Sequence, residues 1–188
     1  LTTAVKLFTT RPASEVSMAD VAREAGVSKA LAFRYFENKR ALFLEAVATA
    51  LEEMEAGSDP DPGLPADRRF REGLSEYLAV SERYPHALRS FMAGDLGRGP
   101  EVQALVQAAS ARTVDRIIAR MGVTEPTPRL RHAVRSWLQF VRACNMEWLE
   151  HHEVSRDTLI DLEIATFRAA VAQSLPLPDV ADGGPFLP

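Results

Sequence analysis

The stretch "GVSKALAFRYFENKRAL", residues 26–42, decides the fold that we expect for the first part of the chain. Just before it, Ser17 is a good N-cap, and Asp20 follows three residues later, as in a capping box. Gly26 can take the left-handed conformation that ends a helix, and Ser28 can cap a second helix immediately afterwards. The spacing therefore predicts two short helices joined by a tight turn, which is a helix-turn-helix unit.

The 3.6-residue period sorts the side chains of the second short helix into two faces. Val27, Ala32 and Phe36 suit the inward face, against the small residues of the first helix. This leaves a basic and apolar face towards solvent, made of Lys29, Ala30, Leu31, Phe33 and Arg34. Basic side chains reach guanine acceptors or phosphates, and apolar ones contact thymine methyl groups. We therefore expect this face to enter a DNA groove; the alternative is that Phe33 packs against a neighbouring helix.

A third helix of the same unit is expected to begin directly after Asn38, which is a suitable cap. Lys39 and the free amides at this helix start would together hold a phosphate, because helix N-termini carry partial positive charge.

Residues 18–42, "MADVAREAGVSKALAFRYFENKRAL", resemble the DNA-binding signature of the TetR family of transcriptional regulators. The resemblance implies that the helix after Ser28 lies in the major groove and that Lys39 binds a phosphate. It also places Ser28, Lys29, Ala30, Leu31 and Arg34 at base-facing or phosphate-facing positions. Phe33 stands where the family usually has Tyr, so a hydroxyl contact is missing, and Tyr35 at the common His position can restore one.

The charge of the chain is distributed unevenly. Residues 1–44 hold seven basic and four acidic side chains, a net charge of +3. Since the whole chain has a net charge of −4, the remainder carries −7. A basic segment on an acidic body suits docking to a polyanion such as DNA.

The remaining sequence predicts an all-α protein with two domains. The first is a three-helix DNA-binding domain at 1–44, and helix 38–56 bridges to a helical regulatory and dimerisation domain at 45–175. The stretch 56–67, rich in Pro, Gly and Asp, predicts a loop, and the Pro- and Gly-rich residues 176–188 predict a loose tail. The later helices are expected at 67–84, 86–96, 100–121, 128–152 and 155–174. By resemblance, this domain encloses a ligand cavity, and its last two helices form the dimer interface.

The last helix supports the dimer from its own pattern. Its apolar residues follow two lines at helical spacing, Ile160, Ile164, Phe167 and Val171 on one, and Leu159, Leu162, Thr166 and Ala170 on the other. A helix that touches only its own domain needs a single line, so the second predicts a partner subunit. The alternative is burial on two sides within a monomer. We expect a homodimer on a palindromic operator.

The effector is expected to be a small, fairly apolar organic molecule, because aromatic, sulfur-containing and aliphatic side chains gather in the middle of the second domain. The candidate lining residues are Tyr77, Phe91, Met92, Trp137, Phe140, Val141, Cys144, Asn145 and Trp148, with Asp95 and Gln103 as further polar contacts. Ligand binding would release the operator, so we expect a repressor; activation is the open alternative.

Other classes of function find less support in the sequence. No apolar run approaches the roughly 18 residues that span a bilayer and no secretory leader opens the chain, so a cytoplasmic location is expected. Leu1 in place of Met indicates that residues precede it in the natural protein. The run "HHE" at 151–153 lacks the spacing of a metal site, and we find no nucleophile, acid–base or phosphate-loop signature. We expect no metal, cofactor or enzymatic activity; a helical adaptor or a helical-bundle enzyme is the alternative.

Overall fold

The computed structural model describes residues 1–57, 61, 63–83 and 99–174, and the regular secondary structure within these ranges is helical without strands. The elements are α1 (Thr2–Thr10), a 3-10 turn η1 (Ala13–Glu15), α2 (Met18–Glu24), α3 (Lys29–Tyr35), α4 (Lys39–Gly57), α5 (Ala66–Arg83), α7 (Pro100–Arg120), α8 (Pro128–His151) and α9 (Arg156–Ala172). The predicted all-α fold is confirmed. The expected helix at 86–96 and tail at 176–188 lie outside the described residues.

The helix-turn-helix forms for the local reasons that the sequence suggests. The Ser17 hydroxyl accepts a hydrogen bond from the Asp20 amide at 3.1 Å, and the Asp20 carboxylate accepts one from the Ser17 amide at 3.0 Å. The Ser17 hydroxyl also donates to the Asp20 carboxylate at 2.6 Å, and this bond together with the one from the Ser17 amide lowers the pKa of Asp20 to about 2. Gly26 has a φ of 67°, and the following amide of Val27 donates to the Ala22 carbonyl at 2.9 Å. The capping box and the glycine turn are therefore confirmed.

The core of the N-terminal part lies between α1, α2, α3 and the first half of α4. Phe8 of α1 meets Phe43 of α4 edge to face, with ring centroids 5.1 Å apart. Ala22 of α2 and Ala32 of α3 are both buried in this core, which lets the two helices approach closely. The same core also includes Val102 of α7, so it reaches beyond the residues that were expected to form it.

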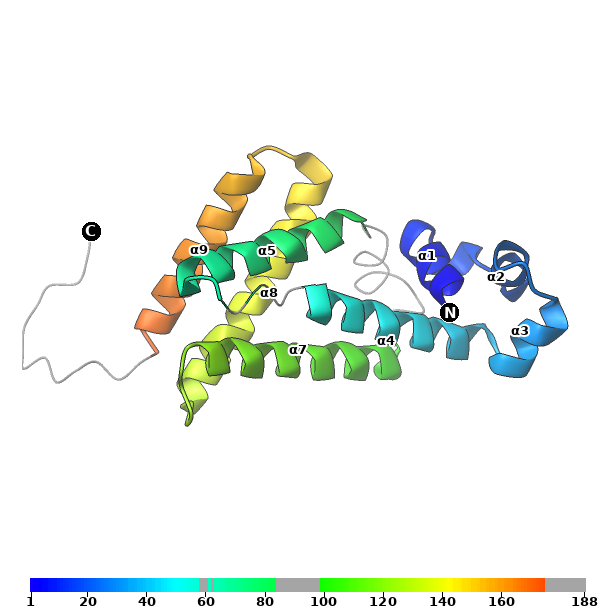
Figure 1. The fold of residues 1–188 in the computed structure, drawn as a ribbon, viewed down its shortest axis with the longest axis horizontal. Coiled ribbons are helices and arrows are strands. Elements are labelled where there is room, and N and C mark those ends of the chain that lie inside the picture. Colours follow the sequence, from blue (N-terminus) through cyan, green and yellow to red (C-terminus); the bar gives the residue numbers. More distant parts are fainter. Residues whose placement is uncertain (58–60, 62, 84–98, 175–188) are drawn as a thin grey trace, which may run out of the picture.

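Helices α4 and α7 lie side by side and run in the same direction (Figure 1). Near their first turns, Arg40 donates to the Glu101 carboxylate at 2.5 Å. About three turns further along α7 and about four turns further along α4, Arg112 reaches Glu55 near the end of α4. Helix α4 therefore extends from the helix-turn-helix into the second domain with α7 along its length.

The second domain packs α5, α8 and α9 together with the C-terminal half of α7 (Figure 1). Its aromatic centre is Trp137 of α8, whose ring centroid lies 5.6 Å from that of Phe70 and 4.7 Å from that of Phe167. The Trp137 indole donates to the backbone carbonyl of Glu163 at 2.9 Å, which joins α8 to α9. Within the described ranges, none of the helices combines the length and apolar character needed to cross a membrane.

Candidate functional site

Helix α3 presents an uncovered basic and apolar surface. The expected contact residues Lys29, Ala30, Leu31, Phe33, Arg34 and Tyr35 are all exposed. Phe33 and Tyr35 are 43% and 75% exposed, so Phe33 does not pack against a neighbouring helix in this protomer. The Lys29 ammonium instead lies 5.8 Å from the centroid of the Phe33 ring, a cation–π contact that holds the two side chains together.

The inward face of α3 differs from the expectation at one residue. Ala32 is buried and Phe36 packs against the N-terminal core, as expected. Val27, however, is 39% exposed. Its backbone amide closes the turn by donating a hydrogen bond to the Ala22 carbonyl, and its side chain extends the exposed surface of α3.

Two further expected contact residues already have partners inside the protein. The Ser28 hydroxyl oxygen accepts from the Leu31 amide at 3.1 Å, and so acts as the N-cap of α3. The Lys39 ammonium donates to the Ser14 carbonyl of η1 at 3.3 Å. At the start of α4, the Asn38 side-chain oxygen accepts a hydrogen bond from the Ala41 amide at 2.9 Å. This amide was expected to be free to bind a phosphate, and it is not.

A cavity of about 710 Å³ lies between α4, α5, α7 and α8. Of the expected ligand-contact residues, Tyr77, Trp137 and Val141 line it, as does Gln103. Phe91, Met92 and Asp95 lie outside the described residues. Four others do not line this cavity, namely Phe140, Cys144, Asn145 and Trp148.

The positions of these four residues correct the expected lining set. Trp148 closes the turn between α8 and α9, because its indole donates to the Val154 carbonyl at 2.7 Å and its ring packs on His152. Phe140 packs in the aromatic core. Asn145 is fully buried. Cys144 is half-buried, and the burial of its thiol raises the pKa of that thiol.

The cavity contains a polar group that the sequence reasoning missed. The Arg142 guanidinium lies at the cavity wall and donates to the Ser110 hydroxyl at 2.7 Å. Burial raises the pKa of the nearby Tyr77 above its ordinary value, and the positive charge of Arg142 partly offsets this effect. Arg135, Gln139 and Arg142 recur at helical spacing and all line the cavity, and this polar line beside Trp137 was the available signal.

A buried carboxyl group was also missed. Glu163 of α9 is 1% exposed, and among the described residues neither of its carboxylate oxygens has a hydrogen-bond partner. Burial raises the pKa of Glu163 to about 8, so the side chain is mostly protonated at neutral pH. Its position four residues after Leu159, on one of the apolar lines of the helix, was the signal in the sequence.

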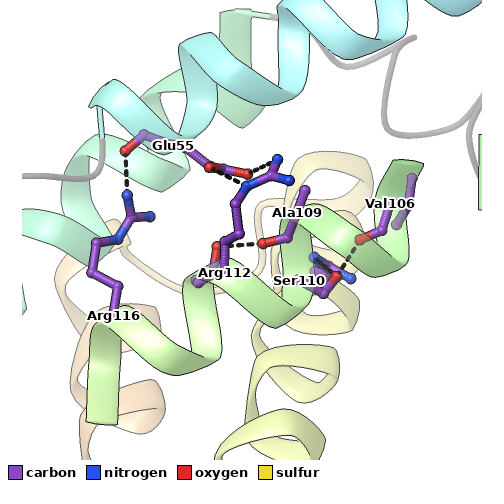
Figure 2. Close-up of polar contacts among 8 residues, drawn as sticks. Glu55, Val106, Ala109, Ser110, Arg112 and Arg116 are labelled. Atoms are coloured by element: carbon purple, nitrogen blue, oxygen red, sulfur yellow. Dashed lines mark hydrogen bonds and ion pairs between the residues drawn. The ribbon is translucent and has the colours of Figure 1, made fainter. Parts of the chain in front are cut away.

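Glu55 connects the end of α4 to α7 at the edge of the cavity (Figure 2). Its carboxylate accepts from two nitrogens of Arg112, at 2.8 and 3.1 Å, and its backbone carbonyl accepts from Arg116 at 3.0 Å. Glu55 and Arg116 both line the cavity. A molecule in the cavity would therefore touch the groups that fasten α4 to α7.

Comparison with known proteins agrees with this arrangement. The family model described as "Bacterial regulatory proteins, tetR family" matches residues 1–46. The HTH-type transcriptional regulator EthR of Mycolicibacterium smegmatis is 29% identical over 93 residues, 48% of this chain and 43% of that protein. The HTH-type transcriptional regulator BetI of Agrobacterium fabrum is 51% identical over 66 residues, 35% of this chain and 31% of that protein. The matches thus span less than half the length of these relatives.

Solved structures extend the likeness to both domains. A tetR-family transcriptional regulator from Streptomyces coelicolor has a TM-score of 0.84 and 26% sequence identity, and the match covers 92% of this chain and 78% of that one. A transcriptional regulator from Rhodococcus sp. RHA1 has a TM-score of 0.73 at 16% identity over 94% and 98% of the two chains, which shows a shared fold.

Proposed function

Because the chain belongs to the TetR family of bacterial regulatory proteins, we propose that it is a transcriptional repressor that binds a palindromic operator as a homodimer and is released by a small organic ligand. The observation that carries the proposal is the exposed surface of α3. The six exposed contact candidates there include two cations, Lys29 and Arg34, and three large side chains, those of Leu31, Phe33 and Tyr35.

The chemistry of this surface suits the major groove. Lys29 and Arg34 supply donors for guanine or phosphate, and Ala30, Leu31 and Phe33 supply apolar contacts for thymine methyl groups. Tyr35 and Ser28 add hydroxyl groups, and Lys39 can exchange its Ser14 carbonyl for a phosphate oxygen. The net charge of +3 on residues 1–44 favours contact of DNA with this end of the protein, since the remainder is acidic and repels phosphates.

Selection of bound sequences from a random duplex pool tests the DNA-binding proposal. We expect a palindromic consensus, and affinity for it that falls steeply between two salt concentrations. The double variant Lys29→Ala/Arg34→Ala should bind at least 10-fold more weakly with an unchanged helical spectrum. Arg68→Ala/Arg83→Ala, which removes two exposed cations from α5, is the matched control and should bind normally. No enrichment at low salt would overturn the proposal.

The dimer is proposed to form through α8 and the exposed face of α9. Leu162 is 50% exposed and lies near Ala165 and Ala169 on the surface of α9. Of the apolar line that was expected to meet a partner, Leu159 is instead buried in its own protomer, and Thr166 and Ala170 are half-buried. In sedimentation experiments, Leu162→Glu should shift the protein towards monomer, whereas Thr124→Glu, at an exposed position between α7 and α8, should shift it less. A wild-type monomer at high concentration would overturn the dimer.

Release of DNA is proposed to act through α4. This helix begins beside the exposed surface of α3, and near its end Glu55 contacts Arg112 and Arg116 of α7 at the cavity (Figure 2). A ligand that binds more tightly to one arrangement of α4 and α7 would favour that arrangement. The change would alter the spacing between the α3 helices of the two protomers, which lie roughly 34 Å apart in a DNA-bound dimer.

A further inference from the structure

The cavity between α4, α5, α7 and α8 has apolar walls and one unusual polar group. The walls include Phe70, Leu74, Val106, Trp137 and Val141. Glu55 is the one carboxylate among the described lining residues, and it is already bonded to Arg112. Arg142 of α8 belongs to the same lining, beside Trp137 and Val141.

Arg142 is the arginine whose surroundings define a site. Its side chain is half-buried, and its hydrogen-bond partners among the described residues are neutral, namely Ser110 and Gln139. The Ser110 hydroxyl gives its own proton to the Val106 carbonyl at 2.6 Å (Figure 2) and therefore acts as an acceptor for Arg142. A half-buried cation ordinarily has an anionic partner. At Arg142, no described residue supplies one.

Tyr77 adds a second donor to the same place. The positive charge of Arg142 acts on the Tyr77 side chain, and the phenolic O–H of Tyr77 is a donor for an acceptor in the cavity. Burial raises the pKa of Tyr77 above 10, so this proton stays in place at neutral pH. A guanidinium fork and a phenol O–H, both at the wall of one apolar cavity, match the two oxygens of a carboxylate.

We propose that the cavity binds an amphiphilic carboxylate, with its carboxylate on Arg142 and Tyr77 and its apolar body among Trp137, Leu74 and Val106. This inference rests on the proposed effector-binding function and names the chemical class of the effector. The cavity volume of about 710 Å³ lies in the range of sites for organic molecules of this kind.

Matched ten-carbon probes test the carboxylate directly. Decanoate, decan-1-ol and decylamine are titrated below their aggregation limits, with affinities from calorimetry. The fluorescence of Trp137 is followed in a Trp148→Phe background, which leaves it as the single tryptophan of the chain. Decanoate should bind at least 10-fold more tightly than decan-1-ol and quench Trp137, since a charge-assisted bidentate contact is worth about that factor or more. Equal binding of the alcohol, preference for the amine, or no binding of decanoate would overturn the proposal.

Variants then assign the preference to the named residues. Arg142→Gln should lower decanoate affinity about 10- to 100-fold and leave decan-1-ol affinity unchanged, and Arg142→Lys should retain part of the preference. Tyr77→Phe should lower decanoate affinity severalfold. Arg129→Gln, an exposed arginine of the same helix outside the cavity, is the control and should bind decanoate normally. If Arg142→Gln keeps both the helical spectrum and the full preference for decanoate, the assignment to Arg142 is wrong.

These binding measurements contain no DNA, so their failure is separate from a failure of the proposed regulator. A protein that binds its selected operator but ignores decanoate overturns the carboxylate inference alone. A protein that binds decanoate through Arg142 but enriches no DNA sequence overturns the repressor and leaves the carboxylate site standing.

Discussion

Replacement of Glu163 by Gln should make the stability of the protein less sensitive to pH. Glu163 is almost fully buried, and its described surroundings offer its carboxylate no hydrogen bond. The titratable groups that sense its charge are Tyr77 of α5 and Cys144 of α8, and the pKa of each is raised above its ordinary value. Both are neutral at pH 7, so nothing in this set favours the ionised carboxylate, and burial raises its pKa to about 8.

The sign and size of the effect follow from linkage. In the unfolded chain Glu163 ionises near its ordinary pKa of 4.5, and in the folded protein near 8. The stability that depends on the protonated carboxyl group is complete below pH 4.5 and is lost as the pH rises towards 8. Between pH 5 and pH 7 this costs wild type about 2.5 kcal/mol, and the loss levels off above pH 8. Glu163→Gln cannot ionise, so its unfolding free energy should gain on wild type by about this amount between pH 5 and 7.

Urea unfolding followed by circular dichroism at pH 5, 6, 7, 8 and 9 measures this difference, with protein concentration held constant. Glu150→Gln, an exposed glutamate of α8, is the matched control and should track wild type at every pH. A difference between Glu163→Gln and wild type that stays constant from pH 5 to pH 8 would refute the reasoning. It would mean that Glu163 is solvated or paired in solution.

Three further expectations concern local structure. Gly26→Ala and Gly122→Ala each place a side chain at a φ near +70° with open space around the new Cβ, so each should lower the unfolding free energy by about 1 kcal/mol in urea titrations. Only Gly26→Ala should also weaken DNA binding. Equal DNA affinity of the two variants would contradict the role of the turn. Asn145→Leu should raise the unfolding free energy by about 1 to 2 kcal/mol, because the side-chain nitrogen and oxygen of the fully buried Asn145 lack hydrogen-bond partners among the described residues. A loss of stability in the same assay would reveal a hidden partner. In Ser17→Ala, NMR titration of the Asp20 carboxyl should give a pKa above about 2, since hydrogen bonds from Ser17 are the main cause of its depression; an unchanged pKa would exclude the capping box as that cause.

The elements that were predicted well are those decided by a few neighbouring residues. Ser17 with Asp20, Gly26 and Ser28 each act within one turn of the chain, so their types and spacing were sufficient to place α2, α3 and the turn. The boundaries of the later helices followed similarly from Gly and Pro residues. Val27 was misplaced because the sequence shows which residue follows the glycine but not how far its side chain turns towards the core.

The cavity could be predicted less well, because its lining depends on how four helices pack. Tyr77, Trp137 and Val141 were found because large apolar residues in the middle of a domain point inward. Trp148 was wrongly included for the same reason, since its type does not reveal that it caps the α8–α9 turn. Arg142 was overlooked because a charged residue at helical spacing is ordinarily solvated, and only the packing of Ser110 and Tyr77 against it shows otherwise.

The same packing explains how a ligand in the cavity could affect the proposed DNA-binding surface of α3. Val102 is fully buried and belongs to the core beneath the helix-turn-helix, yet it also lines the cavity. Leu51 of α4 and Val106 of α7 likewise pack against that core and face the cavity. Because closely packed cores do not deform freely, a ligand that displaces these side chains must move α4 or α7 as a unit. Coupling between the two sites then needs no chain of intermediate contacts, since one wall of the proposed effector cavity is also a wall of the core that holds α3 in place.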